Sequence, residues 1–303
     1  MNKFAPRREL GRTGFRATLL GIGDIADRQV PLEQCVRTIR RALEAGLNLI
    51  DTAPGYEDGY SEEIVGAALA GCREGVFVID KIDHLDQPVS LQVDGSLQRL
   101  KLAETDAFVF HAVSKMEDWR NLTAPGGGFD QLAEVVVAGK TRFRGISSHH
   151  PEVLQAAIGS GLCDLLMFPV GPFVDPRYVE MILPQARAAG IGTVCFKTFG
   201  AGKLVGDTTG YNQPLQQRPR GKISSGGGTA GLQLPHLSAA ECLHYTLTLD
   251  PDVALLGLSF PNEQDEAFAA TRCFERLSPE QMEDIRQRAV LAVRDKGPVW
   301  WNP

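Results

Sequence analysis

The stretch LNLIDTAPGYEDGYSEEIVGAALAGCREGVFVIDK, residues 47–81, contains one complete unit of the pattern that decides the fold. The apolar run Leu47–Ile50 is typical of a buried strand, and Val76–Ile79 is a second run of the same kind. Between them, Ser61 followed by two glutamates indicates a helix N-cap with carboxylates in the first turn. This order predicts two parallel strands joined by a crossover helix.

The same alternation recurs along the whole chain. Longer amphipathic segments separate eight short apolar runs, which are Ala17–Ile22, Leu47–Ile50, Val76–Ile79, Ala107–Phe110, Phe143–Ile146, Leu165–Phe168, Ile191–Phe196 and Val253–Leu256. Eight strand-helix units can close into a barrel, a fold that typically takes roughly 250 residues before insertions. The chain has 303 residues, which leaves room for long loops.

An open, doubly wound sheet is the rival architecture, and it usually carries Gly-x-Gly-x-x-Gly after its first strand. Here Gly21-Ile22-Gly23 is followed by Asp24-Ile25-Ala26, which does not complete that motif. We therefore expect the α/β class, as a (β/α)8 TIM barrel in a single domain over residues 1–303.

Three further segments are expected to decorate the barrel. Turn residues within Arg8–Phe15 predict an N-terminal β-hairpin that could plug the barrel bottom. The long, Gly-rich stretch Gly200–Leu237 follows a predicted strand, which favours a lid over the substrate or cofactor. A shorter Gly-rich insert, Ala124–Gly128, is expected to form a substrate-facing wall.

The composition is that of a globular protein with a large core, at 43% hydrophobic and 22% charged residues. A net charge of −6 and the lack of a Lys/Arg cluster oppose a nucleic-acid partner. No apolar run approaches the roughly 20 residues of a membrane span, so we expect a cytoplasmic protein with no membrane partner. The six cysteines are scattered singly, which predicts buried hydrophobes and no metal site. The sequence carries no indication of oligomeric state.

Four polar residues lie at or just beyond predicted strands: Asp51, Tyr56, Lys81 and His111. The carboxyl ends of the strands are where barrel enzymes hold their active sites. Carbonyl reduction needs a hydride donor, which a nicotinamide supplies, and an acid that protonates the forming alkoxide. Tyr56 is the natural candidate for that acid.

Each of the four residues can be given a role in this chemistry. A free phenol has a pKa of ~10, and a neighbouring Lys81 would stabilise the phenolate and bring the pKa of Tyr56 down toward working pH. Asp51 would keep Lys81 charged and in place. His111 could donate from a ring nitrogen to the substrate oxygen, as a neutral electrophile or oxyanion donor.

Other interpretations stay open. Taken singly, Lys81 could be a solvated lysine, Asp51 an N-cap, Tyr56 a packed aromatic and His111 a core histidine. A Schiff-base aldolase is the main alternative enzyme, although an adjacent Asp51 would keep Lys81 protonated and unreactive. A cofactor-binding barrel that serves as a regulatory or interaction subunit is an alternative of a different class.

A set of short motifs, in order along the chain, resembles the aldo-keto reductase family. The matching pieces are Leu10-Gly11-Arg12-Thr13-Gly14, Ile50-Asp51-Thr52-Ala53 with Tyr56, Ser61-Glu62 with Gly66, Asp80-Lys81, Asp106 with His111, and Gly139-Lys140 with Gly145-Ile146-Ser147. The resemblance implies an NAD(P)H-dependent oxidoreductase acting on a small-molecule carbonyl/alcohol substrate. It also implies that Asp51, Tyr56, Lys81 and His111 are the catalytic residues.

The resemblance further implies a cofactor site at the ends of the strands. Its expected members are Gly23, Asp24, Asp51, Ser147, Ser148, Met167, Phe196, Lys197, Thr198, Phe199, Gly200, Gly202, Leu204, Gly257, Ser259, Glu263 and Glu266. Phe196 would stack on the nicotinamide, and Lys197 would meet the pyrophosphate. Ser148 and Met167 stand where the family has asparagine and glutamine, so fewer hydrogen bonds to the carboxamide are expected.

The adenosine end of that site bears on the choice of cofactor. The segment Leu256–Glu266 resembles the family's adenosine-binding motif but has no basic residue, and it shows Glu263 and Asp265. Carboxylates repel a 2′-phosphate and accept from a free ribose hydroxyl, so NAD is favoured over NADP unless Arg272 or Lys203 reaches the site. Ala267 replaces an asparagine expected to contact adenine.

Two tryptophans are expected to bind substrate. They are Trp119, just before the Gly-rich insert, and Trp300 in the C-terminal tail.

Overall fold

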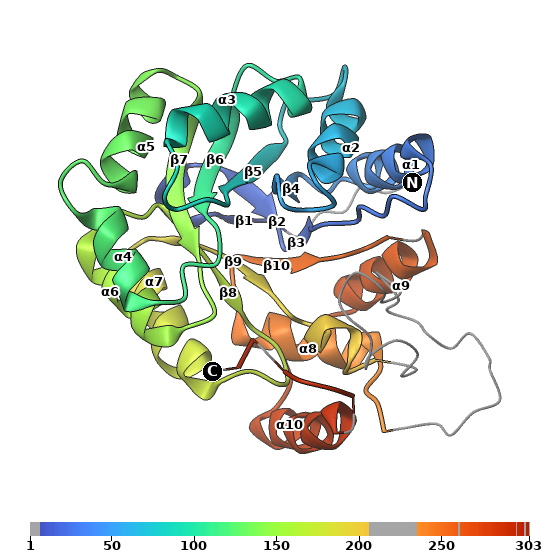
Figure 1. Ribbon diagram of the computed structural model, residues 1–303. Coiled ribbons are helices and arrows are strands. Elements are labelled where there is room, and N and C mark those ends of the chain that lie inside the picture. Colours follow the sequence, from blue (N-terminus) through green and yellow to red (C-terminus); the bar gives the residue numbers. More distant parts are fainter. Residues whose placement is uncertain (1–6, 206–234, 260, 295, 300, 303) are drawn as a thin grey trace.

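The computed structural model describes residues 7–205, 235–259, 261–294, 296–299 and 301–302. Within these ranges, parallel strands form a closed barrel in the order β10-β3-β4-β5-β6-β7-β8-β9, with helices around it (Figure 1). The strands are β3 (Leu20–Ile22), β4 (Leu49–Asp51), β5 (Phe77–Ile82), β6 (Thr105–Phe110), β7 (Thr141–Ser147), β8 (Leu165–Pro169), β9 (Gly192–Phe196) and β10 (Val253–Leu256). The predicted (β/α)8 barrel is therefore confirmed.

Each of the eight predicted apolar runs contributes a barrel strand, but the first run was assigned too much length. Residues 17–22 divide between β2 (Arg16–Thr18), which belongs to the N-terminal hairpin, and the barrel strand β3. Thr18 accounts for the break, because its backbone N–H donates to Asn48 Oδ1 (2.7 Å) and its hydroxyl to the Leu20 carbonyl (2.7 Å). These bonds tie the chain to the base of β4 before β3 begins.

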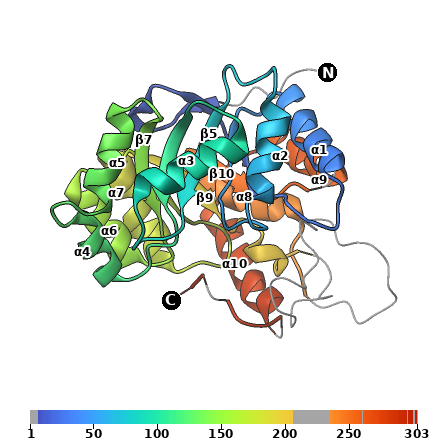
Figure 2. The ribbon, with the colours of Figure 1, turned by 45° about the horizontal axis from the view of Figure 1, so that its top comes forward.

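The helices cover the outside of the barrel (Figures 1 and 2). They are α1 (Leu32–Glu44), α2 (Tyr60–Leu69), α3 (Val89–Leu100), α4 (Met116–Thr123), α5 (Gly128–Val137), α6 (Pro151–Ser160), α7 (Leu183–Ala188), α8 (Ala239–Leu249), α9 (Pro261–Arg272) and α10 (Pro279–Val293). None of the helices in the described residues is both long and apolar enough to cross a membrane.

The start of α2 differs from the sequence interpretation. The N-cap is Gly59, at φ 82°, and the helix already includes Ser61. Ser61 does not cap the helix because its hydroxyl instead accepts a hydrogen bond from Thr52 Oγ1 (2.9 Å). This bond joins the helix to the residue that follows β4, where the catalytic candidates begin.

The barrel interior is apolar and is closed at one end by the predicted hairpin. Leu10 and Ala17 of the hairpin pack with Phe77, Val109 and other inward-facing strand residues in one buried cluster. The hairpin is built from β1 (Arg7–Glu9) and β2, which pair antiparallel.

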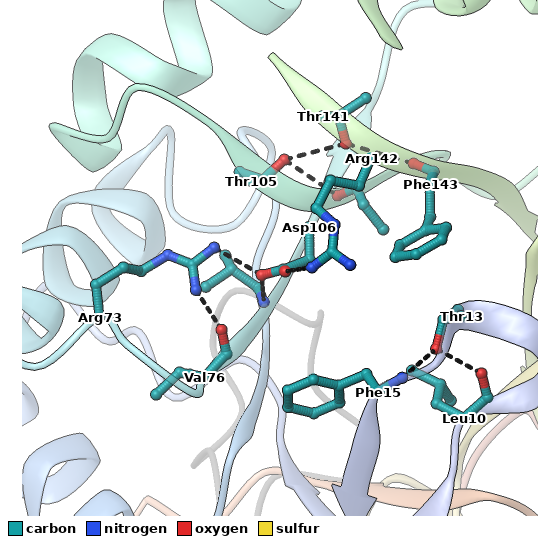
Figure 3. Close-up of polar contacts among 12 residues, drawn as sticks. Leu10, Thr13, Phe15, Arg73, Val76, Thr105, Asp106, Thr141, Arg142 and Phe143 are labelled. Carbon is teal, nitrogen blue, oxygen red and sulfur yellow. Dashed lines mark hydrogen bonds and ion pairs between the residues drawn. The ribbon is translucent and has the colours of Figure 1, made fainter. Parts of the chain in front are cut away.

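Polar contacts fasten the hairpin and the base of the barrel (Figure 3). The Arg12 backbone N–H donates to the Gly190 carbonyl (2.7 Å), which joins the hairpin turn to the start of β9. Asp106, at the base of β6, accepts from Arg73 (2.6 Å) and Arg142 (3.2 Å). Asp106 therefore serves the closed end of the barrel, away from His111.

A second carboxylate anchors the hairpin to the end of α8. Asp250 forms ion pairs with three arginines from separate parts of the chain, Arg8, Arg187 and Arg276. Arg8 also donates to the Asp250 carbonyl (2.9 Å). The bottom of the barrel is thus held by charge as well as by packing.

The predicted lid, Gly200–Leu237, lies mostly in residues 206–234, outside the described residues. Its two ends are described and lie together. Val205 bridges Leu237, and the Leu237 backbone N–H donates to the Leu204 carbonyl (2.7 Å).

Two glycines of the hairpin turn allow a matched test of this closure. Gly11 (φ 48°) lies against the backbone of residues 190–192, so an added Cβ would collide with it, whereas Gly14 (φ 70°) has open space around it. We expect Gly14→Ala to cost about 1 kcal/mol from backbone strain alone and Gly11→Ala about 3 kcal/mol or more. Equal losses of unfolding free energy in urea titrations would show that the hairpin turn does not press on β9.

Candidate active site

The four predicted catalytic residues meet at the end of the barrel opposite the hairpin. Asp51 is the last residue of β4, Lys81 lies in β5, and His111 directly follows β6. Tyr56 lies in the loop between β4 and α2. Because β4, β5 and β6 are neighbours in the barrel, the parallel strand ends bring these side chains to one place.

Lys81 forms a buried ion pair at the centre of this group. Its Nζ donates to Asp51 Oδ1 (2.6 Å) and to the Thr52 carbonyl (2.7 Å), and both charged side chains are 2% exposed. Burial lowers the pKa of Lys81, but Asp51 and then Tyr56 outweigh burial, so that the pKa is raised. Lys81 is a permanent cation here, which opposes its use as a Schiff-base nucleophile.

Tyr56 lies against this cation. The Lys81 Nζ is 4.6 Å from the centre of the Tyr56 ring. Burial raises the pKa of Tyr56 and Lys81 lowers it, and burial wins. The predicted lowering of this pKa is therefore wrong, because the desolvation of a phenolate outweighs a single nearby cation. The phenol is held in its protonated form, the form that an acid in a reduction needs.

An unusual backbone turn positions Tyr56. Glu57 and Asp58 both have φ of 51°, and Gly59 has φ of 82°, so three consecutive residues are left-handed. Arg28 Nη2 donates to the carbonyls of Glu57 (2.6 Å) and Asp58 (3.1 Å). Left-handed backbone at non-glycine residues is costly and persists where other contacts enforce it. Here the guanidinium is one such contact.

His111 completes the group and has a partner that the sequence analysis missed. Its ring lies edge-on to Tyr56, with ring centres 5.5 Å apart, and its Nδ1 is 2.5 Å from Asp83 Oδ1. Residues two apart on a strand share a face, so a carboxylate two positions after Lys81 could have been placed on the same side. Asp83 lies just past the end of β5, where that periodicity is easily overlooked.

The predicted pyrophosphate loop has a backbone suited to close approach. Lys197, Gly200, Ala201 and Gly202 all have positive φ. Within the described residues, the Lys197 Nζ lies 5.6 Å from the ring centre of Phe196 and 5.9 Å from that of Trp301. Burial lowers the pKa of Lys197 to about 8. Phe199 and Leu204 pack in the core beside this loop.

The predicted carboxamide contacts lie at the end of β7 and within β8. Ser147 Oγ accepts from the Ala112 backbone N–H (2.8 Å), and Ser148 Oγ accepts from the His150 backbone N–H (3.1 Å). Each hydroxyl oxygen is therefore held in place by a hydrogen bond from a backbone N–H. Met167 packs in the barrel interior and is 1% exposed. A direct role for these three residues in cofactor binding stays a prediction.

Several predicted cofactor residues lie just beyond the ends of β3, β9 and β10 and carry polar groups that a ligand could pair with. The hydroxyls of Thr198 and Ser259 are buried and have no hydrogen-bond partner within the described residues, a state that bound ligands commonly relieve. The Gly23 backbone N–H donates to the Leu256 carbonyl (2.8 Å), and a Cβ on Gly257 would approach the Asp24 carbonyl at 3.3 Å. The open ends of β3 and β10 are thus joined in a strip of backbone and small residues that a dinucleotide could follow.

A basic residue from a distant part of the chain contacts the adenosine segment, which the sequence analysis did not predict. Arg41 of α1 donates from Nη1 to Gln264 (2.9 Å) and from Nη2 to Asp265 (2.6 Å). The charge of Asp265 is therefore paired. Glu263 is 1% exposed within α9. Glu266 lies in the same helix and is half-buried.

In the described part of the chain, Lys203 and Arg272, the two residues named as possible partners of a 2′-phosphate, make no hydrogen bond or ion pair with the adenosine segment. Lys203 is fully buried, and its Nζ donates to the Lys296 carbonyl. Lys296 in turn donates to the Lys203 carbonyl (2.8 Å), so the two lysines cross-link the loop to the C-terminal segment. Arg272 is exposed in the last turn of α9.

The expected substrate contacts find little support. Trp119 is 5% exposed and packs edge-on against Phe129, with ring centres 5.5 Å apart, in the core between the helices and the barrel. Residues 124–127 form the turn between α4 and α5, and Gly128 begins α5. A substrate-facing role for this Gly-rich insert stays a prediction. Trp300 lies outside the described residues.

The fold and this group of residues describe a (β/α)8 barrel with titratable side chains gathered at the carboxyl ends of its strands. A family model described as the aldo/keto reductase family matches residues 19–289. The chain therefore belongs to the aldo/keto reductase family, a family of nicotinamide-dependent oxidoreductases.

The individual relatives are only distantly similar to this chain in sequence. The aldo-keto reductase YhdN of Bacillus subtilis is 29% identical over 223 residues, an alignment that covers 65% of this chain and 63% of that protein. The NADH-specific methylglyoxal reductase of Escherichia coli is 27% identical over 229 residues, covering 66% and 67%. An aldo-keto reductase from Klebsiella pneumoniae, solved with NADPH, superposes with a TM-score of 0.69 at 20% identity over 97% of both chains. At that identity the superposition shows the fold alone.

The ion pair at the barrel mouth can be tested by removing its cation. Lys81→Met leaves Asp51 buried without its partner, and such changes cost roughly 3–5 kcal/mol. Arg37→Met is the control, because Arg37 pairs with Glu33 in water, at 70% and 90% exposure, and we expect no measurable change from its loss. The readout is the free energy of unfolding by urea titration. Equal losses in the two variants would contradict the central place of Lys81.

Proposed function

We propose that this chain reduces small aldehydes and ketones to alcohols with NAD(P)H, using Tyr56 as its acid. The observation that carries the proposal is the contact between Lys81 and Tyr56, with Nζ 4.6 Å from the ring centre and fixed there by Asp51. A phenol beside a permanent cation can lose a proton and be stabilised at that moment. Tyr56 and His111 lie next to one another, so one substrate oxygen could contact both.

The protein residues would act in sequence on that oxygen. His111 orients the carbonyl and stabilises negative charge as it forms on oxygen. Tyr56 then gives its proton to the oxygen, and the Lys81 ammonium stabilises the phenolate that results. Asp51 keeps Lys81 charged throughout. In the reverse direction the same groups accept the alcohol proton.

The nicotinamide cofactor supplies the hydride when it is bound. Phe196 would stack on its ring, Thr198 and Ser259 would offer their unpartnered hydroxyls, and Lys197 would meet phosphate charge. The preference for NAD over NADP rests on Glu263 and on the lack, within the described residues, of a basic side chain placed to meet a 2′-phosphate. It is weaker than the sequence suggested, because Arg41 neutralises Asp265. One relative is named as NADH-specific and a structural neighbour holds NADPH.

We infer that the substrate is small, with short aldehydes, 2-oxoaldehydes such as methylglyoxal and sugars as the first compounds to try. The support is a relative named as a methylglyoxal reductase. The direct assay follows loss of NADH or NADPH absorbance over this panel. Tight cofactor binding with no turnover on any member would instead favour the regulatory-subunit alternative.

Replacing the acid is the first test of the mechanism. We expect Tyr56→Phe to lower kcat about a hundredfold or more, in the range of general acid catalysis. Tyr60→Phe is the control, because Tyr60 lies four residues after Tyr56 and its hydroxyl donates to the Val30 carbonyl (3.0 Å). It should leave kcat within about twofold. Undiminished turnover in Tyr56→Phe would reject Tyr56 as the acid.

Cofactor affinity should depend on pH through Lys197. Because burial lowers the pKa of Lys197 to about 8, its positive charge is present below that pH and lost above it. The cofactor phosphates attract only the charged form, so we expect the cofactor Kd to rise about tenfold between pH 7 and pH 9. Lys197→Arg, which stays charged, should flatten the profile. Fluorescence titration measures Kd, and the same pH dependence in both proteins would contradict this role.

A further inference from the structure

The carboxylate of Asp83 is held on both of its oxygens. Oδ1 lies 2.5 Å from His111 Nδ1, and Oδ2 accepts from the Gly55 backbone N–H at 2.6 Å. A Cβ on Gly55 would collide with Oδ2, so the absence of a side chain there lets the two loops meet. Asp83 is 15% exposed and His111 is 26% exposed. Both side chains are therefore partly exposed to solvent, Asp83 less than His111.

This arrangement determines which nitrogen of His111 carries a proton. Burial raises the pKa of Asp83, but the hydrogen bond and charge of His111 and the Gly55 N–H together lower it, so Asp83 is ionised. An ionised carboxylate only accepts, and Nδ1 must therefore be the N–H. The remaining nitrogen, Nε2, is left for the substrate. It can donate to a carbonyl oxygen only when the ring carries both protons.

We propose that Asp83 is a positioning residue that makes His111 donate to the carbonyl oxygen as an imidazolium, rather than as the neutral imidazole expected from the sequence. The inference rests on the proposed reductase function. The cation at Nε2 would stabilise the oxyanion more strongly than a neutral N–H, because charge-assisted hydrogen bonds are roughly twice as strong. Reduction would then require the doubly protonated ring and would decline as pH rises.

The other groups around His111 do not replace Asp83. Tyr56 faces the ring as a neutral phenol, and Asp51 is already paired with Lys81. His149, after β7, packs its ring against Phe196, with ring centres 5.3 Å apart. Its pKa is lowered to about 3 by burial first and by the positive charges of Lys197 and His111, so it stays neutral. Asp83 is the carboxylate that the described residues place in direct contact with the ring.

Asp83→Asn separates the charged from the neutral form of the donor. An amide has one acceptor oxygen, which the Gly55 N–H would take, and its NH₂ would then donate to Nδ1 and place the ring proton on Nε2. We expect kcat for reduction, at saturating cofactor and pH 7, to fall about tenfold while cofactor Kd is unchanged. The alkaline decline of kcat should also flatten, because a neutral donor has no second proton to lose.

Two comparisons make this test specific. Asp86→Asn changes an exposed carboxylate three residues further along the same loop and should leave kcat and its pH profile as in the wild type. Asp83→Asn/His111→Asn should lose no more activity than His111→Asn alone, because Asp83 acts through His111. A wild-type pH profile in Asp83→Asn, or additive losses in the double variant, would overturn the proposal.

A spectroscopic measurement tests Asp83 without turnover, so a failure of the proposed function can be told apart from a failure of this inference. Two-bond ¹H–¹⁵N correlation spectra of the wild-type protein report which ring nitrogen of His111 is protonated, with His111→Asn giving the assignment. At alkaline pH, where the ring is neutral, we expect the proton on Nδ1. A proton on Nε2 in the wild type would overturn the inference whether or not any carbonyl is reduced.

Discussion

Lys81 and Asp51 are two opposite charges inside the barrel mouth, and burial would make either one costly without the other. Removing an ion from water into a protein interior costs several kcal/mol, and a close partner offsets that cost only with good geometry. Here the geometry comes from adjacent parallel strands and from the Thr52 carbonyl, which takes a second ammonium proton. The Tyr56 ring lies against this fixed cation, with Lys81 Nζ 4.6 Å from the ring centre. Burial keeps the phenol protonated although the cation lowers its pKa.

The sequence predicted the parts of the fold that depend on local pattern. The eight apolar runs form strands that are buried on both faces, between the barrel interior and the helices. Such strands show in the sequence as consecutive apolar residues. The break after Thr18 is different, because it depends on Asn48, which lies 30 positions away. A pattern read along the chain cannot show such a contact before the barrel is closed.

The candidate site divides in the same way. The four catalytic candidates, Asp51, Tyr56, Lys81 and His111, could be found from their types and from their places at or just beyond strand ends. Strand spacing could place Asp83 on the same side as Lys81, but it could not show the contact with His111, because that contact depends on two loops meeting over Gly55. Arg41 was missed because it reaches Asp265 from 224 positions away. The pKa of Tyr56 went in the opposite direction from expectation because burial is a property of the folded molecule, and the neighbouring cation was the part that the sequence revealed.

The contacts at the base of the barrel also constrain how the chain can fold. Arg8 bonds to Asp250, 242 positions later, and β3 pairs with β10. The first barrel strand therefore cannot complete its pairing until the last one is present. Contacts of such long sequence separation require loop closure before they stabilise anything, and they slow folding. On a ribosome, the hairpin and β3 would emerge long before their partners. Until the last strand is made, β3 has an open edge, and the growing chain is exposed to aggregation for nearly the whole of its synthesis.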